Sequence, residues 1–179
     1  MLQPTNLDLA YLAGMIDADG YISIQRSVHK PRAPGASPRH YHAPKIGIAG
    51  THRAPHDFAA QFWGGVVSTH HPKNDNHKIQ FQWSRCGAIA ADMILVVMPF
   101  LKIKQQQAQL ALELWEHLCA GKGDDPFPWF GPYYDPMVDR DRMWAEMVNL
   151  NGSRAQLRIR NAGEIENLLQ PQPFPWQVQ

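Results

Sequence analysis

The chain has few cysteines and no long apolar run, and both absences narrow the classes of protein it can belong to. Its 179 residues include only Cys86 and Cys119, whose spacing fits neither a CxxC metal pair nor a disulfide framework. We therefore expect a reducing compartment, cytoplasmic or organellar, and no secretion. The longest apolar run, residues 93–101, contains Pro99 and is far shorter than the roughly 18 residues that a membrane span needs. Neither a signal peptide nor a membrane partner is expected.

Acidic residues are also missing from a long part of the chain. No Asp or Glu occurs between Gly20 and His56, and the window from Gly20 to Ala91 holds nine Lys or Arg against two acids. Most of the remaining acids lie between Glu113 and Glu146. Although the formal net charge is only +1, a basic half and an acidic half are typical of a protein with one face toward phosphate. Unevenly distributed solvated charge is the alternative.

The stretch LAGMIDADG, residues 12–20, places two acids at the end of a predicted helix. Asn6 or Asp8 is expected to cap the start of this helix, and the last glycine of the stretch is expected to end it. The carboxylates of Asp17 and Asp19 then lie near the negative end of the helix dipole, where they cost stability unless a cation or a partner group compensates them. A purely structural helix would favour Lys or Arg in this turn.

Helical spacing divides the same segment into two stripes. The large residues are Leu9, Leu12, Met15 and Ile16. The opposite stripe consists of Ala10, Ala13, Gly14 and Asp17. The large residues can face a core, whereas the small residues allow the backbone of another helix to approach closely. Because the chain contains no second copy of the motif, we expect the same stripe of a second chain as the partner, which makes the protein a homodimer.

Two pairs of segments alternate between apolar and polar residues, as half-buried strands do. They cover residues 21–29 with 39–49, and residues 64–71 with 77–84. The outward polar row is predicted to contact DNA and consists of Ser23, Gln25, Ser27, Lys45, Ser68, His70, Lys78, Gln80 and Gln82. Such groups can bond base edges in a major groove, which admits a two-stranded ribbon, although each one singly could also be merely solvated. Adjacent strand residues point to opposite faces, so His70 is interpreted as DNA-facing rather than as half of a metal pair with His71.

The remaining segments complete the expected organisation. Helices are predicted at residues 56–63, 88–98, 100–118, 136–150 and 161–169, with Asp135 capping the fourth. A core at residues 5–119, a loop with helices at 120–169 packed on that core, and a flexible tail at 170–179 are the expected parts of the chain.

The LAGMIDADG stretch differs from the LAGLIDADG signature at one position, where Met15 replaces leucine, and an alternating strand follows it as in that signature. MPFLKIKQQQAQLALEL resembles the segment of the chloroplast-intron members that carries an active-site lysine. MWAEMVNLNGSRAQLR resembles their C-terminal helix and the phosphate-contacting loop after it. The chain thus resembles a LAGLIDADG homing endonuclease of the single-motif, homodimeric type over most of residues 5–160.

This resemblance implies an α+β fold with an αββαββα core, in which four antiparallel strands form a saddle in the major groove of double-stranded DNA. It implies that Asp19 binds a divalent metal ion, Mg²⁺ or Mn²⁺, with help from the Ala18 carbonyl. Lys104 matches a lysine that stabilises charge near the scissile phosphate, and a solvated lysine is the alternative. Asp17 is interpreted as structural at the interface. The implied activity is metal-dependent hydrolysis of both strands of a long pseudo-palindromic site, with no small-molecule substrate.

One departure from the family pattern falls at Gly50, a catalytic position where many members have a glutamine that orients the attacking water. Its loss predicts slower cleavage or replacement by a neighbouring side chain. Ser153, Arg154 and Arg158 are candidates for phosphate contact beyond the C-terminal helix.

Three classes of function remain open at this stage. Cleavage of DNA accounts for the acid pair, Lys104 and the basic strands together. An intron maturase that binds RNA, or a catalytically inactive DNA- or RNA-binding relative, would share the fold, and Gly50 keeps this class open. An oligomeric structural protein would explain the small-residue stripe but neither the acids nor the basic sheet.

Overall fold

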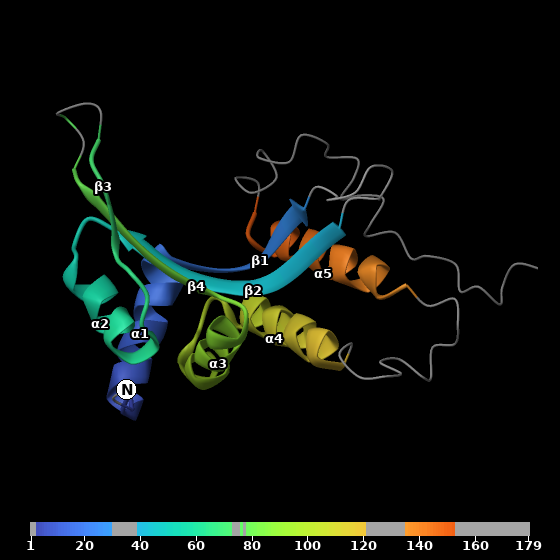
Figure 1. Ribbon diagram of the computed structural model, residues 1–179. Coiled ribbons are helices and arrows are strands. Elements are labelled where there is room, and N and C mark those ends of the chain that lie inside the picture. Colours follow the sequence, from blue (N-terminus) through green and yellow to red (C-terminus); the bar gives the residue numbers. More distant parts are fainter. Residues whose placement is uncertain (1–2, 30–38, 73–75, 77, 121–134, 153–179) are drawn as a thin grey trace, which may run out of the picture.

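The computed structural model describes residues 3–29, 39–72, 76, 78–120 and 135–152 (Figure 1). The elements are α1 (Asn6–Asp19), β1 (Gly20–His29), β2 (Arg39–Gly50), α2 (Ala54–Trp63), β3 (Ser68–His70), β4 (Gln80–Cys86), α3 (Ala88–Val97), the 3-10 helix η1 (Met98–Phe100), α4 (Gln105–Ala120) and α5 (Pro136–Leu150). From α1 to α3 the order is αββαββα, as predicted. No helix among these residues is long and apolar enough to cross a membrane.

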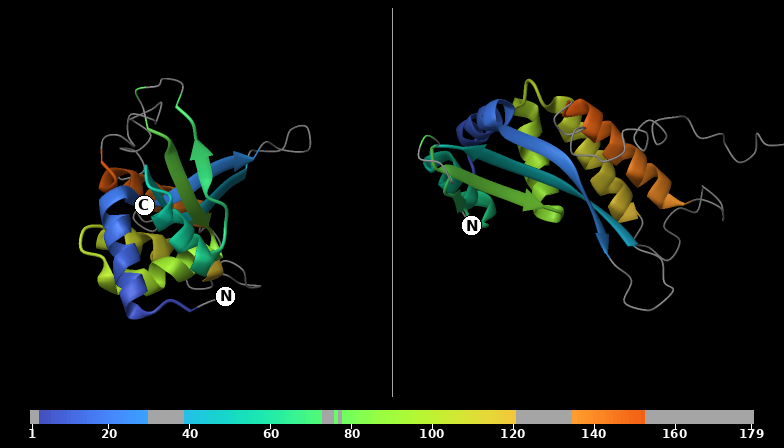
Figure 2. Two further views of the ribbon diagram at one scale, coloured as in Figure 1. Left: turned by 90° about the vertical axis from the view of Figure 1, so that its left-hand side faces the viewer. Right: turned by 90° about the horizontal axis from the view of Figure 1, so that it is seen from above.

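The four strands form one antiparallel sheet in the order β1-β2-β4-β3. The sheet curves over the helices α1 to α4, and α5 lies beside the far end of β1 and β2 (Figures 1 and 2). Gly20 is opposite Ile48 at the α1 end of the β1–β2 ribbon, and Lys45 is opposite Cys86 across β2 and β4. The predicted fold class, α+β with a four-stranded antiparallel sheet, is confirmed.

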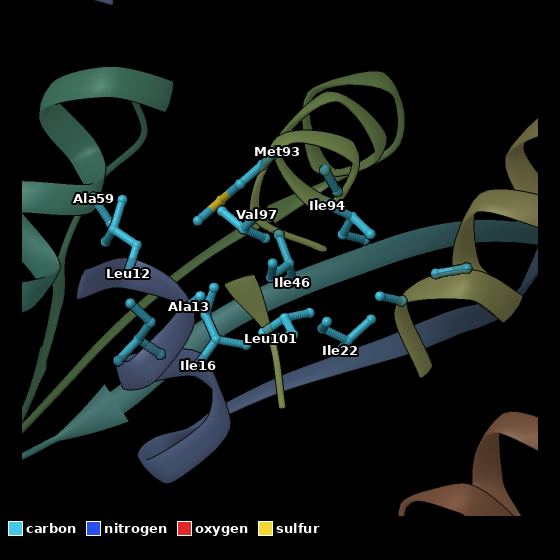
Figure 3. Packing of buried hydrophobic residues seen from close by; sticks show 14 of the residues in the cluster. Leu12, Ala13, Ile16, Ile22, Ile46, Ala59, Met93, Ile94, Val97 and Leu101 are labelled. Atoms are coloured by element: carbon cyan, nitrogen blue, oxygen red, sulfur yellow. The ribbon is translucent and has the colours of Figure 1, made fainter. Parts of the chain in front are cut away.

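The strand alternation predicted from the sequence holds in the sheet. We call the side that carries Ile22, Ile46, Ile48 and Trp83 the inner face, because all four side chains are fully buried against helices. Residues one position away along each strand form the outer face. Leu12 and Ile16 of α1, Met93 and Ile94 of α3 and Leu101 complete this core (Figure 3).

The start of α1 differs from the prediction, because Thr5 rather than Asn6 or Asp8 is the N-cap. The Thr5 hydroxyl oxygen accepts a bond from the Asp8 backbone N–H at 3.3 Å, and the Asp8 carboxylate accepts one from the Thr5 backbone N–H at 2.7 Å. This reciprocal capping box satisfies two donors that the helix cannot bond internally. The bonds from Thr5 also lower the pKa of Asp8.

The predicted division of α1 into two stripes is wrong at Ala13. The buried residues of α1 are Leu9, Leu12, Ala13 and Ile16, which follow the i, i+3, i+4, i+7 spacing of a single helical face. Ala13 therefore packs in the core of its own chain beside Ile16 (Figure 3). Ala10 and Gly14 remain exposed, so a helix–helix interface at these two residues stays a prediction.

The predicted ends of α5 are confirmed. The Asp135 carboxylate accepts a bond from the Met137 N–H at 2.9 Å, and Asn151 follows the last helical residue. The basic segment 153–160, the helix predicted at 161–169 and the tail lie outside the described residues, as does most of the loop before α5. The predicted division of the chain into core, C-terminal part and tail therefore stays a prediction.

Candidate functional site

The carboxylate of Asp17 joins the end of α1 to the turn that precedes α4. It accepts hydrogen bonds from three successive backbone N–H groups, those of Lys102 at 2.7 Å, Ile103 at 3.2 Å and Lys104 at 3.0 Å. Burial alone would raise the pKa of Asp17, but these bonds and the Lys104 charge outweigh it and hold the pKa below its ordinary value. Within one chain, Asp17 is thus a structural residue that fixes two segments to each other.

The side chain of Lys104 returns toward the same helix end. Its ammonium donates to the backbone carbonyl oxygens of Ile16, at 2.9 Å, and of Asp17, at 2.5 Å. These carbonyls belong to the last turn of α1, where partial negative charge gathers, and the Ile16 carbonyl also accepts a bond from the Gly20 backbone N–H. Lys104 is therefore the cation that makes the acid-rich end of α1 tolerable. A role for it at a phosphate stays a prediction.

Asp19 is in a different situation from Asp17, although only one residue separates them. Its side chain is exposed, and no hydrogen bond or ion pair occupies its carboxylate within the part of the chain that the structure describes. A carboxylate together with the adjacent Ala18 carbonyl is the oxygen donor type that Mg²⁺ prefers. The described residues contain no cluster of three His, Cys, Asp or Glu side chains, so the remaining ligands would have to come from water, phosphate or a second chain.

Gly20 sets the position of Asp19 by allowing the chain to pass directly from helix to strand. A Cβ atom at residue 20 would lie 2.6 Å from the Ile16 Cα and 2.8 Å from the Gly47 carbonyl oxygen. Both contacts are shorter than real side chains tolerate, so only glycine fits between α1 and β2. A glycine was expected here to end the helix. The reason for glycine is steric rather than conformational, because Gly20 has a φ of −93°, outside the left-handed region.

Gly50 ends β2 opposite Phe81 and presents no polar group at this position. A Cβ atom here would have one close neighbour, the Cε1 atom of His56 at 3.7 Å, which is an ordinary contact. The buried imidazole of His56 bonds the His52 carbonyl oxygen through Nδ1 at 2.9 Å. A histidine from α2 is therefore the nearest side chain to the position where the family pattern has glutamine.

The residues predicted to contact DNA share the outer face of the sheet. Cross-strand register places Ser23 beside Lys45, Gln82 beside Ser68, and Gln80 beside His70. Gln25 and Ser27 continue the row on β1, and exposed Lys78 lies just before β4. The shared face is confirmed for the predicted residues that lie within strands, whereas contact with DNA stays a prediction. Ser153, Arg154 and Arg158 lie outside the described residues.

Tyr21 belongs to this outer face and was missed by the sequence analysis. Its ring crosses its partner Gly47, because a Cβ atom at residue 47 would lie 2.7 Å from both Cζ and the hydroxyl oxygen of Tyr21. The Lys45 ammonium lies 5.9 Å from the ring centroid. The alternation of residues 23, 25 and 27 extends back to residue 21 and could have identified it.

The inner face carries a charged cluster at the far end of the ribbon. Asp141 of α5 lies 2.9 Å from Arg26 Nε and 2.9 Å from His42 Nε2, and the Arg26 guanidinium stacks 4.6 Å from the Trp144 ring centroid. Burial lowers the pKa of His42, and the Asp141 carboxylate opposes this effect without reversing it. Arg26 thus ties α5 to the sheet.

Other cations of the basic half are also engaged away from the outer face. Arg53 pairs with Asp57 one turn along α2 at 3.0 Å, and Arg85 is half-buried on the side of β4 that carries the buried Trp83. Among the cations of residues 20–91 whose side chains the structure describes, Lys45 lies on the outer face and Lys78 is exposed just before β4. The basic half of the sequence therefore does not gather all its cations on the outer face.

Comparison with known proteins identifies the fold through solved structures. No protein-family model and no curated protein matches the chain. It is similar to the homing endonuclease I-CvuI in complex with its target in the presence of calcium, with a TM-score of 0.61 at 17% identity, covering 91% of this chain and 92% of that one.

Two further homing endonucleases give comparable superpositions. The archaeal intron-encoded I-Vdi141I, complexed with DNA, has a TM-score of 0.55 at 11% identity and covers 92% of this chain and 93% of its own. I-TnaI has a TM-score of 0.54 at 14% identity and covers 90% and 95%. The chain thus has the fold of the LAGLIDADG homing endonucleases that the signature suggested.

Proposed function

We propose that the protein is a homing endonuclease that, as a homodimer, makes metal-dependent double-strand breaks in a long pseudo-palindromic DNA site. The observation that carries this proposal is the contrast between the two acids of the motif. Asp17 is engaged by three backbone N–H groups, whereas Asp19 is exposed and has no partner among the described residues. A fixed helix end that presents one free carboxylate next to a polar sheet face is suited to hold a cation over DNA.

Asp19 and the Ala18 carbonyl would hold Mg²⁺ or Mn²⁺, which when bound activates water and neutralises charge at the cleaved phosphate. The other residues act on the helix end itself. Asp17 fixes the end of α1 against the turn before α4. Lys104 donates to the carbonyls of that helix end and offsets their partial negative charge. The inner core behind α1 keeps this end rigid, so the free carboxylate is pre-organised.

The proposal requires two chains, because the described part of one chain presents one unpartnered carboxylate, that of Asp19, at the end of α1. The exposed side of α1 is apolar or small at Leu7, Ala10, Tyr11 and Gly14, and Leu7 is 83% exposed. Such a face supports helix-to-helix packing about a two-fold axis, which would bring two Asp19 carboxylates to the two strands of one duplex.

A dimer contact at Gly14 can be tested directly. Nothing lies within 4 Å of a Cβ at this position in the single chain, so Gly14→Leu should leave the monomer fold intact. Against a second helix the larger side chain should cost about 1 to 3 kcal/mol of association, and sedimentation should show monomer. Ala88→Leu on the exposed start of α3 is the matched control. An unchanged Gly14→Leu dimer would contradict this interface.

The length of the site follows from the sheet. β1 has 10 residues, which at about 3.3 Å per residue span roughly 33 Å. This corresponds to about ten base pairs on each side of the centre, at about 3.4 Å per pair. Protection of one short half-site alone would contradict a symmetric dimer on DNA.

Gly50 favours the second candidate, a binding protein without efficient cleavage, such as an RNA-binding maturase. Its position offers no hydrogen-bonding side chain to orient water, and the neighbouring His56 is buried. RNA binding in place of DNA binding would support this candidate.

The deciding experiment compares Asp19→Asn with Asp92→Asn, which changes an exposed acid on α3. Asparagine keeps the shape but removes the charge that holds a hard cation, so Asp19→Asn should abolish cleavage in Mg²⁺. Gel-shift affinity in Ca²⁺ should be kept or improved, because two fewer carboxylates per dimer face the phosphates. Asp92→Asn should match wild type in both assays. Wild type that binds but never cuts DNA, or Asp19→Asn that cuts normally, would refute the catalytic assignment.

A further inference from the structure

The side of β1 that faces away from β2 is a free edge of the sheet. β1 is the first strand in the order β1-β2-β4-β3, and β2 is its one neighbour among the described strands. Ile24 of β1 is opposite Pro44, which has no N–H, and the Pro44 carbonyl oxygen accepts a bond from the N–H of Gly87, directly after β4, at 2.9 Å. Ile24 and Pro44 therefore form a pair without mutual hydrogen bonds, and the backbone groups of Ile24 point to the free edge.

Every second residue of β1 directs its backbone groups to this edge. Ile22 shows this directly, because its carbonyl oxygen accepts a bond from Nδ2 of Asn151 at 3.0 Å. Val28 lies four positions beyond Ile24 in the same strand and has the same direction. No described residue bonds the backbone of Ile24 or Val28 on this side. An unpaired strand edge of this kind readily accepts another extended segment.

An exposed apolar side chain marks the far end of the same edge. Val28 alternates with the outward residues of β1 and so belongs to the inner face, yet it is 56% exposed, whereas Ile24 is 5% exposed. Val138 of α5 is 47% exposed and lies about one turn before Asp141, which contacts Arg26. The described helices therefore cover the inner face near the start of β1 and leave it open at Val28.

The chain that continues from α5 starts at this edge. Asn151 is the C-cap of α5, and Gly152 has a φ of +78°, a left-handed conformation that allows the chain to turn. Residues 153–160, SRAQLRIR, alternate between two kinds of side chain. The apolar row is Ala155, Leu157 and Ile159, and the polar row is Arg154, Gln156, Arg158 and Arg160. This period of two predicts a strand with one apolar and one basic face.

We propose that residues 153–160 bind the free edge of β1 as a fifth strand, parallel to β1, and complete the inner face at Val28. The direction follows from the Asn151 bond, because a segment that leaves α5 beside Ile22 can follow β1 only from its start toward its end. Counted residue for residue from Asn151 beside Ile22, Leu157 lies opposite Val28. The apolar row then joins the inner face, and the arginines lie on the outer side.

The covalent link to α5 favours this segment over other occupants of the edge. A segment that begins beside the edge has an effective concentration there on the order of millimolar, which a second chain or a free peptide does not reach at ordinary protein concentrations. The inference goes beyond the proposed function, because it concerns a contact within one chain and requires no DNA.

Amide hydrogen exchange of the full chain, measured by NMR without DNA, tests the fifth strand. The Val28 N–H should be protected in wild type to an extent similar to the Ser27 N–H, which faces β2. Leu157→Asp places a carboxylate in the apolar row, so exchange at Val28 should become about ten-fold faster or more while Ser27 is unchanged. Leu169→Asp, the same change outside the segment, is the matched control and should exchange as wild type does.

The contrary outcomes separate the other occupants. An unprotected Val28 N–H in wild type would overturn the proposal without the need for any variant. Equal protection of Val28 in wild type and Leu157→Asp, or an equal loss in Leu169→Asp and Leu157→Asp, would overturn it as well. Protection that increases with protein concentration would assign the edge to a second chain instead. Because no DNA is present in the experiment, the proposed function would stand after each of these results.

Discussion

The two faces of the β1–β2 ribbon use charge in opposite ways. On the inner face, Arg26 and His42 converge on a single carboxylate, Asp141, and tie α5 to the sheet. On the outer face, hydroxyl and amide groups dominate and Lys45 stands among them. A run of sequence rich in basic residues therefore does not by itself locate a basic surface, because alternate positions on a strand point to different faces of the sheet.

Gly47→Ala would disturb the packing of β2 against β1 and β4, on which both faces depend. We expect it to have the largest effect on stability. The new Cβ atom would lie 2.7 Å from the Trp83 carbonyl oxygen and 2.7 Å from the Tyr21 ring. Backbone cannot move aside as a flexible side chain can, so the free energy of unfolding should fall by about 3 kcal/mol. Gly50→Ala in the same strand is the control, because its Cβ atom meets only His56 at 3.7 Å. Equal denaturant midpoints for the two variants would contradict this account.

Asp141→Asn would break the inner face selectively. The side chains of Arg26 and Asp141 are 15% and 17% exposed, so loss of the carboxylate removes a counterion from the largely buried Arg26 guanidinium. Unfolding free energy should fall by about 2 kcal/mol, while DNA affinity of the folded protein is retained. Asp57→Asn, in the exposed pair with Arg53, should cost no more than about 0.5 kcal/mol. Parallel unfolding curves and gel shifts measure both quantities.

Lys45→Gln would change the charge of the outer face and leave the inner face unchanged. Removal of one cation should weaken DNA binding and lower the salt dependence of affinity by about one unit of log–log slope per chain. Stability should stay within about 0.5 kcal/mol, because this residue anchors no helix. An unchanged salt slope would remove Lys45 from the DNA-contacting surface.

The smallest expected effect is a pH dependence that belongs to the inner face. Burial lowers the pKa of His42, and burial together with the Arg140 charge lowers that of His117. The folded protein then binds fewer protons than the unfolded chain as the pH falls below the ordinary value of 6.5, so stability should decline there and recover above it. A variant with His42→Gln and His117→Gln should flatten this part of the stability profile. Persistence of the slope in that variant would place its origin elsewhere.

Local patterns were sufficient to predict β1, β2 and the ends of α5. The strand predicted at 64–71 is shorter, Ser68–His70, and the helix predicted from residue 100 begins only at Gln105, after the turn that bonds Asp17. Alternation placed Ile22 and Ile46 inside, and the Asp135–Pro136 pair marked the start of α5, because both signals depend only on nearby residues. The N-cap of α1 was predicted at Asn6 or Asp8 but is Thr5. Thr5 and Asp8 act as a pair, which single-residue cap preferences do not show.

Long-range contacts set the parts of the candidate site that local patterns could not reveal. Asp17 bonds N–H groups that lie more than eighty residues along the chain, so periodicity alone assigned it to an interface. Alternation alone places Tyr21 on the outer face, but the packing of its ring across Gly47 depends on cross-strand register. Ala13 was assigned to the wrong stripe because its small size suggested a helix contact, whereas its neighbours in the core decide its burial.

The position of Lys104 has a consequence that concerns the number of its protons. A lysine ammonium carries three N–H donors, and two of them are directed to the Ile16 and Asp17 carbonyls at the end of α1. One donor is left over within the described structure. The Lys104 side chain can therefore hold the helix end and still donate one further hydrogen bond.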